Sequence, residues 1–231
     1  MTLRALIFDV DGTLAETEEA HRQAFNETFA AHGLGWDWSR EDYRRLLRTS
    51  GGKERIRAWL SEIGAAGDAV DVPALHAAKT ERYVAILRAG GLALREGVAA
   101  LVADARTAGL KIAIATTTSR PNVEALCQCC WGRHGDAVFD VIAAGDEVPA
   151  KKPAPDVYLL ALERLGIAPR DAVAIEDSRN GVLSAQAAGL RVLVTPSLYT
   201  EHVAFGSAPV LRSLARGALP DDLRAALPVS V

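Results

Sequence analysis

Two acidic residues follow the first apolar run of the chain at a spacing of two. The stretch FDVDGTL (residues 8–14) places Asp9 and Asp11 directly after that run and before Gly12 and Thr13. Like charges this close raise each other's pKa and destabilise a fold unless a metal or a reaction uses them. Asp9 and Asp11 are therefore candidate catalytic residues.

Other polar groups follow later apolar runs in the same way. They comprise four hydroxyls, two lysines and two acids: Thr116, Thr117, Thr118 and Ser119; Lys151 and Lys152; Glu176 and Asp177. Taken singly, each group has an ordinary structural explanation, such as a helix cap, a solvated pair or an acid at a helix N-terminus. In an open parallel sheet, however, ligands bind outside the carboxyl ends of the strands. The coincidence of all these groups at one sheet edge favours a functional site.

The chemistry that this set could perform is phosphoryl transfer. Asp9 could be the nucleophile that forms an aspartyl-phosphate, and Asp11 the acid and base for the leaving oxygen and water. Because an anion must approach an anion, a cation is needed. The carboxylates of Asp9 and Asp177 and the carbonyl of Asp11 could hold Mg²⁺. Lys152 and the Thr116 hydroxyl could bind the remaining phosphoryl oxygens.

The elements that must position these residues are buried strands alternating with helices. Five nearly continuous apolar runs, typical of strands buried on both faces, span residues 4–9, 111–117, 140–146, 171–177 and 191–196. Helical patterns between them run from residue 98 to Gly109, from 156 to 165 and from 178 to 188. The alternation predicts an α/β fold with a doubly wound parallel sheet.

One long interval, between residues 14 and 91, contains only helical patterns. A capping-type Ser39 and a first-turn Pro73 mark two of its helix starts. The interval is too long for an ordinary loop and large enough for a subdomain. We expect a catalytic core formed by residues 1–15 and 92–231, with an inserted α-helical cap domain at 16–91. The last dozen residues are expected to form a peripheral tail.

Composition limits the classes of partner. The 231 residues are 49% hydrophobic, with a net charge of −3. That balance lacks the basic bias of nucleic-acid binding, and no run is long enough to span a membrane. We expect a cytoplasmic protein, monomeric, with a small-molecule substrate.

A cluster of three cysteines lies outside these motifs. Cys127, Cys129 and Cys130 lie close to His134. Their spacing differs from that of structural zinc sites, so buried or half-buried free thiols are favoured over zinc.

The motifs together resemble those of the haloacid dehalogenase superfamily. The matching residues are DVDGT (9–13), Thr116, Lys152 in KKPAPD, and EDS (176–178). The insertion resembles the C1-type cap of the β-phosphoglucomutase-like branch. The resemblance implies a Rossmann-like core, with Asp9 as nucleophile and Asp11 as acid and base. It implies phosphate ligands at Thr116, Thr117 and Lys152, and a Mg²⁺ site at Asp9, Asp11, Asp177 and Glu176.

The same resemblance implies a substrate site between cap and core. Its residues would be Glu16, His21, Gly51, Gly52, Lys53, His76, Lys79, Thr118 and Ser119. Glu16 departs from the Asp that is more common in this branch. The stretch DGTLAETEEAHRQAFN is similar to CbbY-type phosphatases, which implies xylulose-1,5-bisphosphate, an inhibitor of Rubisco in the Calvin cycle, as substrate.

Two alternatives remain open. A phosphomutase of the β-phosphoglucomutase type would share these residues, and phosphate release from a bisphosphate would distinguish the two. A signalling receiver domain also phosphorylates an Asp at a strand end, but it needs no cap.

Overall fold

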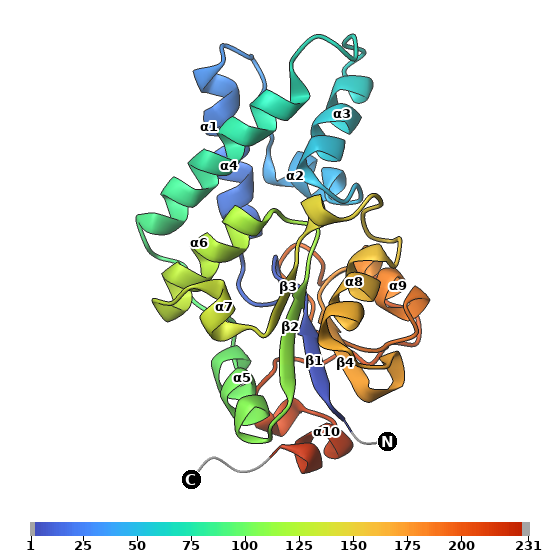
Figure 1. Ribbon diagram of the computed structural model, residues 1–231. Helices are drawn as coiled ribbons and strands as arrows, with labels where there is room; N and C mark the ends of the chain where they lie inside the picture. The colour runs from blue at the N-terminus through green and yellow to red at the C-terminus, as the bar shows by residue number, and fades with distance from the viewer. Residues whose placement is uncertain (1–2, 228–231) are drawn as a thin grey trace.

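Five parallel strands form the centre of the protein in a computed structural model that describes residues 3–227. Their bounds are β1 (Ala5–Phe8), β2 (Lys111–Ala115), β3 (Val141–Ala143), β4 (Ala172–Glu176) and β5 (Arg191–Val194). The strands lie in the order β3-β2-β1-β4-β5 (Figure 1). Each strand coincides with an apolar run that predicted it and is shorter than that run, because the polar residues at its end leave the ladder. The predicted parallel sheet is confirmed.

β1 occupies the centre of the sheet and pairs along its whole length with β2 and β4. Successive side chains of a strand point to opposite faces. Leu6 and Phe8 therefore pack into the core on one face, and Ala5 and Ile7 into the core on the other. Burial on both faces explains why the sequence of this strand is continuously apolar.

Helices cover both faces of the sheet, as Figure 1 shows. The helices α5 (Val98–Thr107), α6 (Arg120–Trp131) and α7 (Gly135–Val138) lie on one face. The helices α8 (Asp156–Leu165) and α9 (Arg179–Ala187) lie on the other. The fold is thus doubly wound, as predicted. α6 was not among the predicted helices, although Pro121 in its first turn is a start signal.

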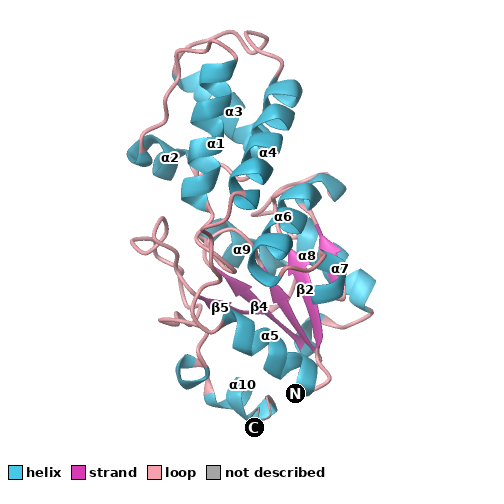
Figure 2. Ribbon diagram, turned by 90° about the vertical axis from the view of Figure 1, so that its left-hand side faces the viewer, coloured by secondary structure: helices cyan, strands magenta, loops and turns pink. Residues whose placement is uncertain are grey.

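Four further helices follow β1 and form an apolar core of their own. They are α1 (Glu18–Ala31), α2 (Arg40–Leu46), α3 (Gly52–Glu62) and α4 (Val72–Arg88). Phe25, Phe29, Trp38 and Tyr43 lie at the centre of that core and are fully buried. Figures 1 and 2 show these helices beyond one end of the sheet. The predicted helical insertion is confirmed, whereas the domain bounds at residues 15, 16, 91 and 92 stay a proposal.

Helix starts in the insertion follow the predicted signals. Ser39 precedes α2 and forms a capping box, because its Oγ accepts from Asp42 N (3.0 Å) while its own N donates to Asp42 Oδ2 (3.2 Å). Pro73 occupies the first turn of α4, where Asp71 Oδ1 accepts from Ala74 N (3.0 Å). Local sequence therefore determines where these helices begin.

The C-terminal segment differs from the expected tail. It contains the short 3₁₀ helix η3 (Arg216–Ala218), which is followed by α10 (Asp221–Ala226). Two other 3₁₀ helices, η1 (Gly145–Glu147) and η2 (Pro169–Asp171), lie between β3 and β4. Leu223 and Leu227 are buried against the main core, so the tail prediction is wrong for residues 220–227. Residues 228–231 lie outside the described part. None of the described helices is long and apolar enough to cross a membrane.

Candidate active site

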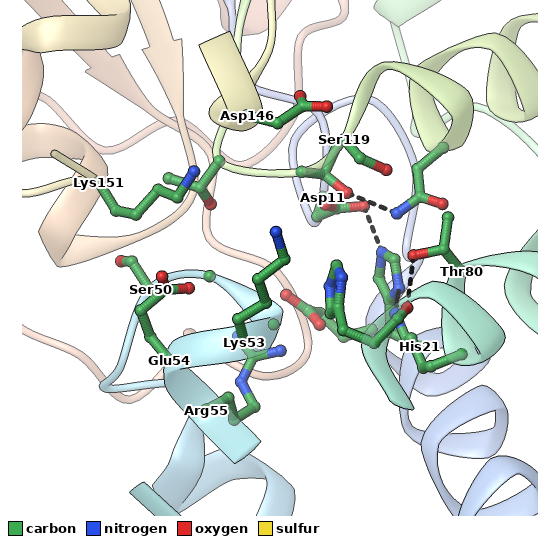
Figure 3. Close-up of a pocket in the computed structure, with 18 of the residues that line it drawn as sticks. Asp11, His21, Ser50, Lys53, Glu54, Arg55, Thr80, Ser119, Asp146 and Lys151 are labelled. Carbon is green, nitrogen blue, oxygen red and sulfur yellow. Dashed lines mark hydrogen bonds and ion pairs between the residues drawn. The ribbon is translucent and has the colours of Figure 1, made fainter. Parts of the chain in front are cut away.

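A cavity of about 660 Å³ separates the carboxyl ends of the strands from the helical insertion. Asp9, Lys152 and Asp177 line it from the sheet, and Lys53 and Lys79 line it from α3 and α4. Figure 3 shows Lys53 pointing from α3 into this space. The cavity therefore brings the residues of the sheet edge and of the insertion into one site.

Lys152 is the centre of a buried acidic cluster. Its Nζ lies 2.7 Å from Asp9 Oδ1 and 2.6 Å from Glu176 Oε1, and it donates to the Ala115 carbonyl (2.9 Å). Burial opposes the charge of Lys152, but Asp9 and Glu176 outweigh that effect and raise its pKa above the usual range. Lys152 is therefore a permanent cation beside Asp9.

Glu176 is fully buried and holds Lys152 in place. Its Oε1 also accepts from Tyr158 OH (2.7 Å), and the Lys152 ammonium lies 4.9 Å from the centre of the Tyr158 ring. A Cβ at Gly181 would overlap the Glu176 carboxyl group, so only glycine lets α9 approach this closely. In this structure one oxygen of Glu176 is thus occupied by Lys152, and its role as a metal ligand stays a prediction.

Three carboxylates of the cluster could hold a cation together. Asp9, Glu176 and Asp177 each offer an oxygen within 4.8 Å of the others, and all three are buried. Burial raises the pKa of Asp9 to about 8, with Glu176 and Asp11 adding to the effect and Lys152 opposing it. Burial and the neighbouring acids likewise hold the pKa of Asp177 well above its usual value.

These pKa shifts indicate that one lysine cannot neutralise the cluster. A carboxyl group with a pKa of about 8 is mostly protonated at neutral pH and is a poor nucleophile. A hard divalent cation bound by oxygen ligands would lower the pKa of Asp9 and let it ionise. The donor set therefore fits Mg²⁺.

Asp11 faces the insertion rather than Asp9. Its Oδ1 accepts from Thr17 Oγ1 (2.6 Å) and lies 3.0 Å from His21 Nε2. His21 Nδ1 lies 2.5 Å from Lys79 Nζ, and the His21 ring stacks on Tyr83 at 3.8 Å. Burial opposes the ionisation of Asp11, but the hydrogen bonds from His21 and Thr17, together with the charge of Lys79, outweigh it and lower the pKa of Asp11 to about 2.

The histidine between Asp11 and Lys79 is neutral. Burial and the charge of Lys79 lower the pKa of His21 to about 4, despite the nearby Asp11. A neutral imidazole has one donor and one acceptor, so Nε2–H donates to Asp11 and Nδ1 accepts from Lys79. Burial and Arg55 lower the pKa of Lys79 to about 7. Lys79 is thus a buried partner of His21, with only 3% of its surface exposed.

The hydroxyl-bearing residues that follow β2 lie in two different environments. Thr117, Thr118 and Ser119 line the cavity, whereas Thr116 is buried at the strand end and its Oγ1 accepts from Thr118 N (3.2 Å). Thr118 Oγ1 accepts from Asn122 Nδ2 (2.9 Å). Phosphate binding by Thr116 and Thr117, and substrate contact by Thr118 and Ser119, stay predictions.

The glycine-rich stretch of the insertion also borders the cavity. Gly51 has a φ of +91° and precedes α3, and a Cβ at Gly52 would overlap the ring of His76 on α4. Gly52 therefore allows α3 and α4 to pack closely at this point. Burial, with the charges of Lys79 and Lys53, lowers the pKa of His76 to about 3, so its ring is neutral. The substrate-binding roles of Gly51, Gly52, Lys53, His76, His21 and Lys79 stay predictions.

Glu16 is placed apart from these residues. Its Oε1 lies 3.2 Å from Arg95 Nε, and its Oε2 accepts from Leu198 N (3.3 Å). It does not belong to the lining of the cavity as the described residues form it. Its contact with substrate stays a prediction, and the structure gives it other partners.

Several cavity residues were missed by the sequence analysis. Glu18 lines the cavity and accepts from Tyr43 OH (2.9 Å), and burial raises its pKa to about 7. Arg55 donates to the same Tyr43 oxygen (3.0 Å), while its buried Nε has no hydrogen-bond partner among the described residues. The spacing of Arg55 two residues after Lys53 was a weak signal, because two positions on a helix face different directions. Glu18 had none.

The cysteine cluster lies on α6, away from the cavity. Cys127 is buried, and Cys129 and Cys130 are partly buried. Burial raises the pKa of Cys127 and Cys130 to about 12, so both remain thiols at neutral pH. His134 Nδ1 lies 2.5 Å from Glu124 Oε1 instead. The prediction of buried or half-buried free thiols is confirmed.

Comparison with known proteins identifies the family. A family model described as haloacid dehalogenase-like hydrolase matches residues 3–189. The chain is 56% identical to protein CbbY of Rhodobacter capsulatus over 225 residues, which cover 96% of this chain and 99% of that one. It is 33% identical to the fructose-1-phosphate phosphatase YqaB of Escherichia coli over 190 residues, 80% of this chain and 92% of the relative.

A solved structure agrees with these relatives. A CbbY variant from Rhodobacter sphaeroides, crystallised with xylulose-(1,5)bisphosphate, superposes with a TM-score of 0.90 at 54% identity, covering 93% of this chain and 96% of that chain. The predicted superfamily is therefore confirmed by sequence and by fold. The chain belongs to the haloacid dehalogenase-like hydrolases, in which it is an enzyme of the phosphatase kind.

Proposed function

We propose that the chain is a Mg²⁺-dependent sugar-phosphate phosphatase that acts on a sugar bisphosphate such as xylulose-1,5-bisphosphate. The proposal is supported by the CbbY relatives and by the bisphosphate in the solved CbbY complex. The observation that carries the proposal is the distribution of charged side chains over the two sides of one cavity. Buried carboxylates and Lys152 lie at the sheet edge, and the cations Lys53 and Arg55 lie on the facing helix.

The metal would be held by the carboxylates of Asp9 and Asp177 and by the main-chain carbonyl of Asp11. When bound, Mg²⁺ would neutralise these carboxylates and the phosphoryl oxygens that approach them. Thr200 Oγ1 donates to Asp177 Oδ2 (3.2 Å) and so orients that carboxylate.

The residues of the protein would act in two steps, formation of an aspartyl-phosphate and its hydrolysis. Asp9 attacks phosphorus through a carboxylate oxygen, the phosphorus–oxygen bond to the sugar breaks, and the leaving oxygen takes a proton from Asp11. A water molecule then attacks the aspartyl-phosphate, gives its proton to Asp11 and releases inorganic phosphate. Lys152 stabilises the charge that develops on the phosphoryl oxygens, because its position is already set by Glu176.

Asp11 must change partners to act as the acid. In the observed arrangement it is ionised and held by Thr17 and His21. Moving toward the substrate would remove these two stabilising contacts, which raises the pKa of Asp11 and allows it to carry a proton. Because Thr17 and His21 belong to the insertion, its position would control when Asp11 is released.

The test is release of inorganic phosphate from a panel of sugar mono- and bisphosphates with Mg²⁺ present. We expect a bisphosphate to be the best substrate and Asp9→Asn to abolish turnover, since an amide cannot form the acyl-phosphate. Asp68→Asn, an exposed acid in the α3–α4 loop, is the matched control and should stay active. Phosphate release persisting within about tenfold in Asp9→Asn would refute the nucleophile. Isomerised sugar phosphate without net release would favour the phosphomutase.

A further inference from the structure

Arg95 lies where the chain returns from the insertion to the sheet, and its side chain binds three main-chain carbonyls. Nη1 donates to the carbonyl of Gly12 and to that of Thr195 (2.7 Å), and Nη2 donates to that of Pro196 (2.6 Å). The side chain is only 16% exposed. A guanidinium has five N–H donors in a rigid planar fork, so it can join two chain segments at once.

Both segments that Arg95 joins lead to the acidic cluster. Gly12 has a φ of +82°, and a Cβ there would overlap the Asp177 carboxyl group. Residues 195–196 lead into the turn from which Thr200 donates to Asp177 Oδ2. The guanidinium therefore holds the segment after β1 against the segment that orients Asp177.

Glu16 fixes Arg95 from the other side. Its Oε1 forms an ion pair with Arg95, with 3.2 Å between Oε1 and Nε, and its Oε2 accepts a hydrogen bond from Leu198 N at 3.3 Å. The main chains of the two connections between insertion and sheet are also paired, because Arg95 N donates to the Leu14 carbonyl (2.8 Å). Glu16 and Arg95 thus connect both linkers of the insertion to the 195–198 segment.

We propose that Arg95 is a positioning residue that, held by Glu16, sets the separation between the Asp9–Asp11 segment and Asp177 before a metal binds. When these acids ionise without a metal they repel one another, and the hydrogen bonds from Arg95 to the three carbonyls resist their separation. This inference rests on the proposed function, since it assumes Mg²⁺ as the ligand. It also gives Glu16 a structural task at the linker in place of sugar recognition.

The experiment measures Mg²⁺ binding by calorimetry on the full chain without substrate, together with thermal unfolding. Lysine keeps the charge of Arg95, but its single ammonium cannot reach three separated carbonyls. We expect Arg95→Lys to weaken Mg²⁺ binding about 10- to 100-fold, as losses around metal ligands typically do. Glu16→Gln keeps an acceptor for Leu198 and should lose about two- to fivefold. Arg212→Lys, an exposed arginine, is the matched control.

Kinetics distinguish positioning from a general loss of stability. In Arg95→Lys we expect kcat at subsaturating Mg²⁺ to fall equally on a small phosphate ester and on a sugar bisphosphate, with KM for each unchanged. Arg95→Lys that binds Mg²⁺ like the wild type would overturn the inference. If Arg95→Lys does not fold, unchanged Mg²⁺ binding in Glu16→Gln overturns it. Absence of Mg²⁺ binding in the wild type would instead refute the proposed function.

Discussion

Lys53 is the side chain through which the insertion should recognise a second phosphate, and Lys53→Ala tests that role. The residue is exposed in the first turn of α3 and points into the cavity. A charge-assisted contact contributes about 1.5–3 kcal/mol. Because solvent screens an exposed ammonium, the lower end applies, and about 1.5 kcal/mol corresponds to roughly tenfold in kcat/KM. We therefore expect a tenfold loss, approximately, on a sugar bisphosphate.

The assay compares two substrates at saturating Mg²⁺ by release of inorganic phosphate. A small artificial ester, which occupies only the sheet side of the cavity, should be hydrolysed by Lys53→Ala within about twofold of the wild type. Arg57→Ala removes the same charge from α3 outside the cavity, where Arg57 lies 3.8 Å from Glu54, and should change neither rate. Equal losses on both substrates would mean that Lys53 only supports the insertion. No loss on either would mean that the second phosphate binds elsewhere.

Further outcomes can be checked on the same protein. A chelator should abolish phosphate release and lower the unfolding temperature, and Mg²⁺ should restore both; full activity in chelator contradicts the metal site. Lys79 loses its proton as the pH rises through about 7, so kcat/KM for a bisphosphate should fall above that pH, and a pH profile unchanged by Lys79→Ala would refute this. Gly181→Ala should destabilise the fold by about 1–3 kcal/mol, because its Cβ overlaps Glu176, and lower kcat by displacing Lys152. In thermal unfolding and turnover, the exposed Leu183→Ala on the same helix is the control, and wild-type behaviour of Gly181→Ala would contradict the packing.

The residues at the sheet edge could be predicted because parallel strands all end at the same edge of the sheet. Asp9 and Asp177 are 168 positions apart in the chain, yet each follows one of two neighbouring parallel strands. Lys152 reaches into the same place and contacts Asp9. Apolar runs of this length form buried strands, and parallel strands end at the same edge. Local composition and strand order therefore determine this half of the site.

The state of the same residues was decided by tertiary packing. Asp11 is one residue in a recognisable motif, but contacts from Thr17 and His21 turn it toward the insertion and lower its pKa to about 2. The sequence predicted Lys79 only as a residue of the substrate site, whereas the packing of α1 on α4 buries it against His21 and lowers its pKa to about 7. Burial and charge at such positions depend on how helices cross, which sequence spacing does not encode.

Pairings between distant segments were also beyond the sequence. The sequence led us to expect Glu16 in contact with substrate. In the fold it pairs with Arg95, far along the chain, because the insertion enters and leaves the sheet at adjacent points. The sequence by itself determined the strands, most of the helices, the sheet edge and the acids placed there. The fold alone decided which polar groups face one another, because those distances depend on how separate elements pack rather than on spacing within any one of them.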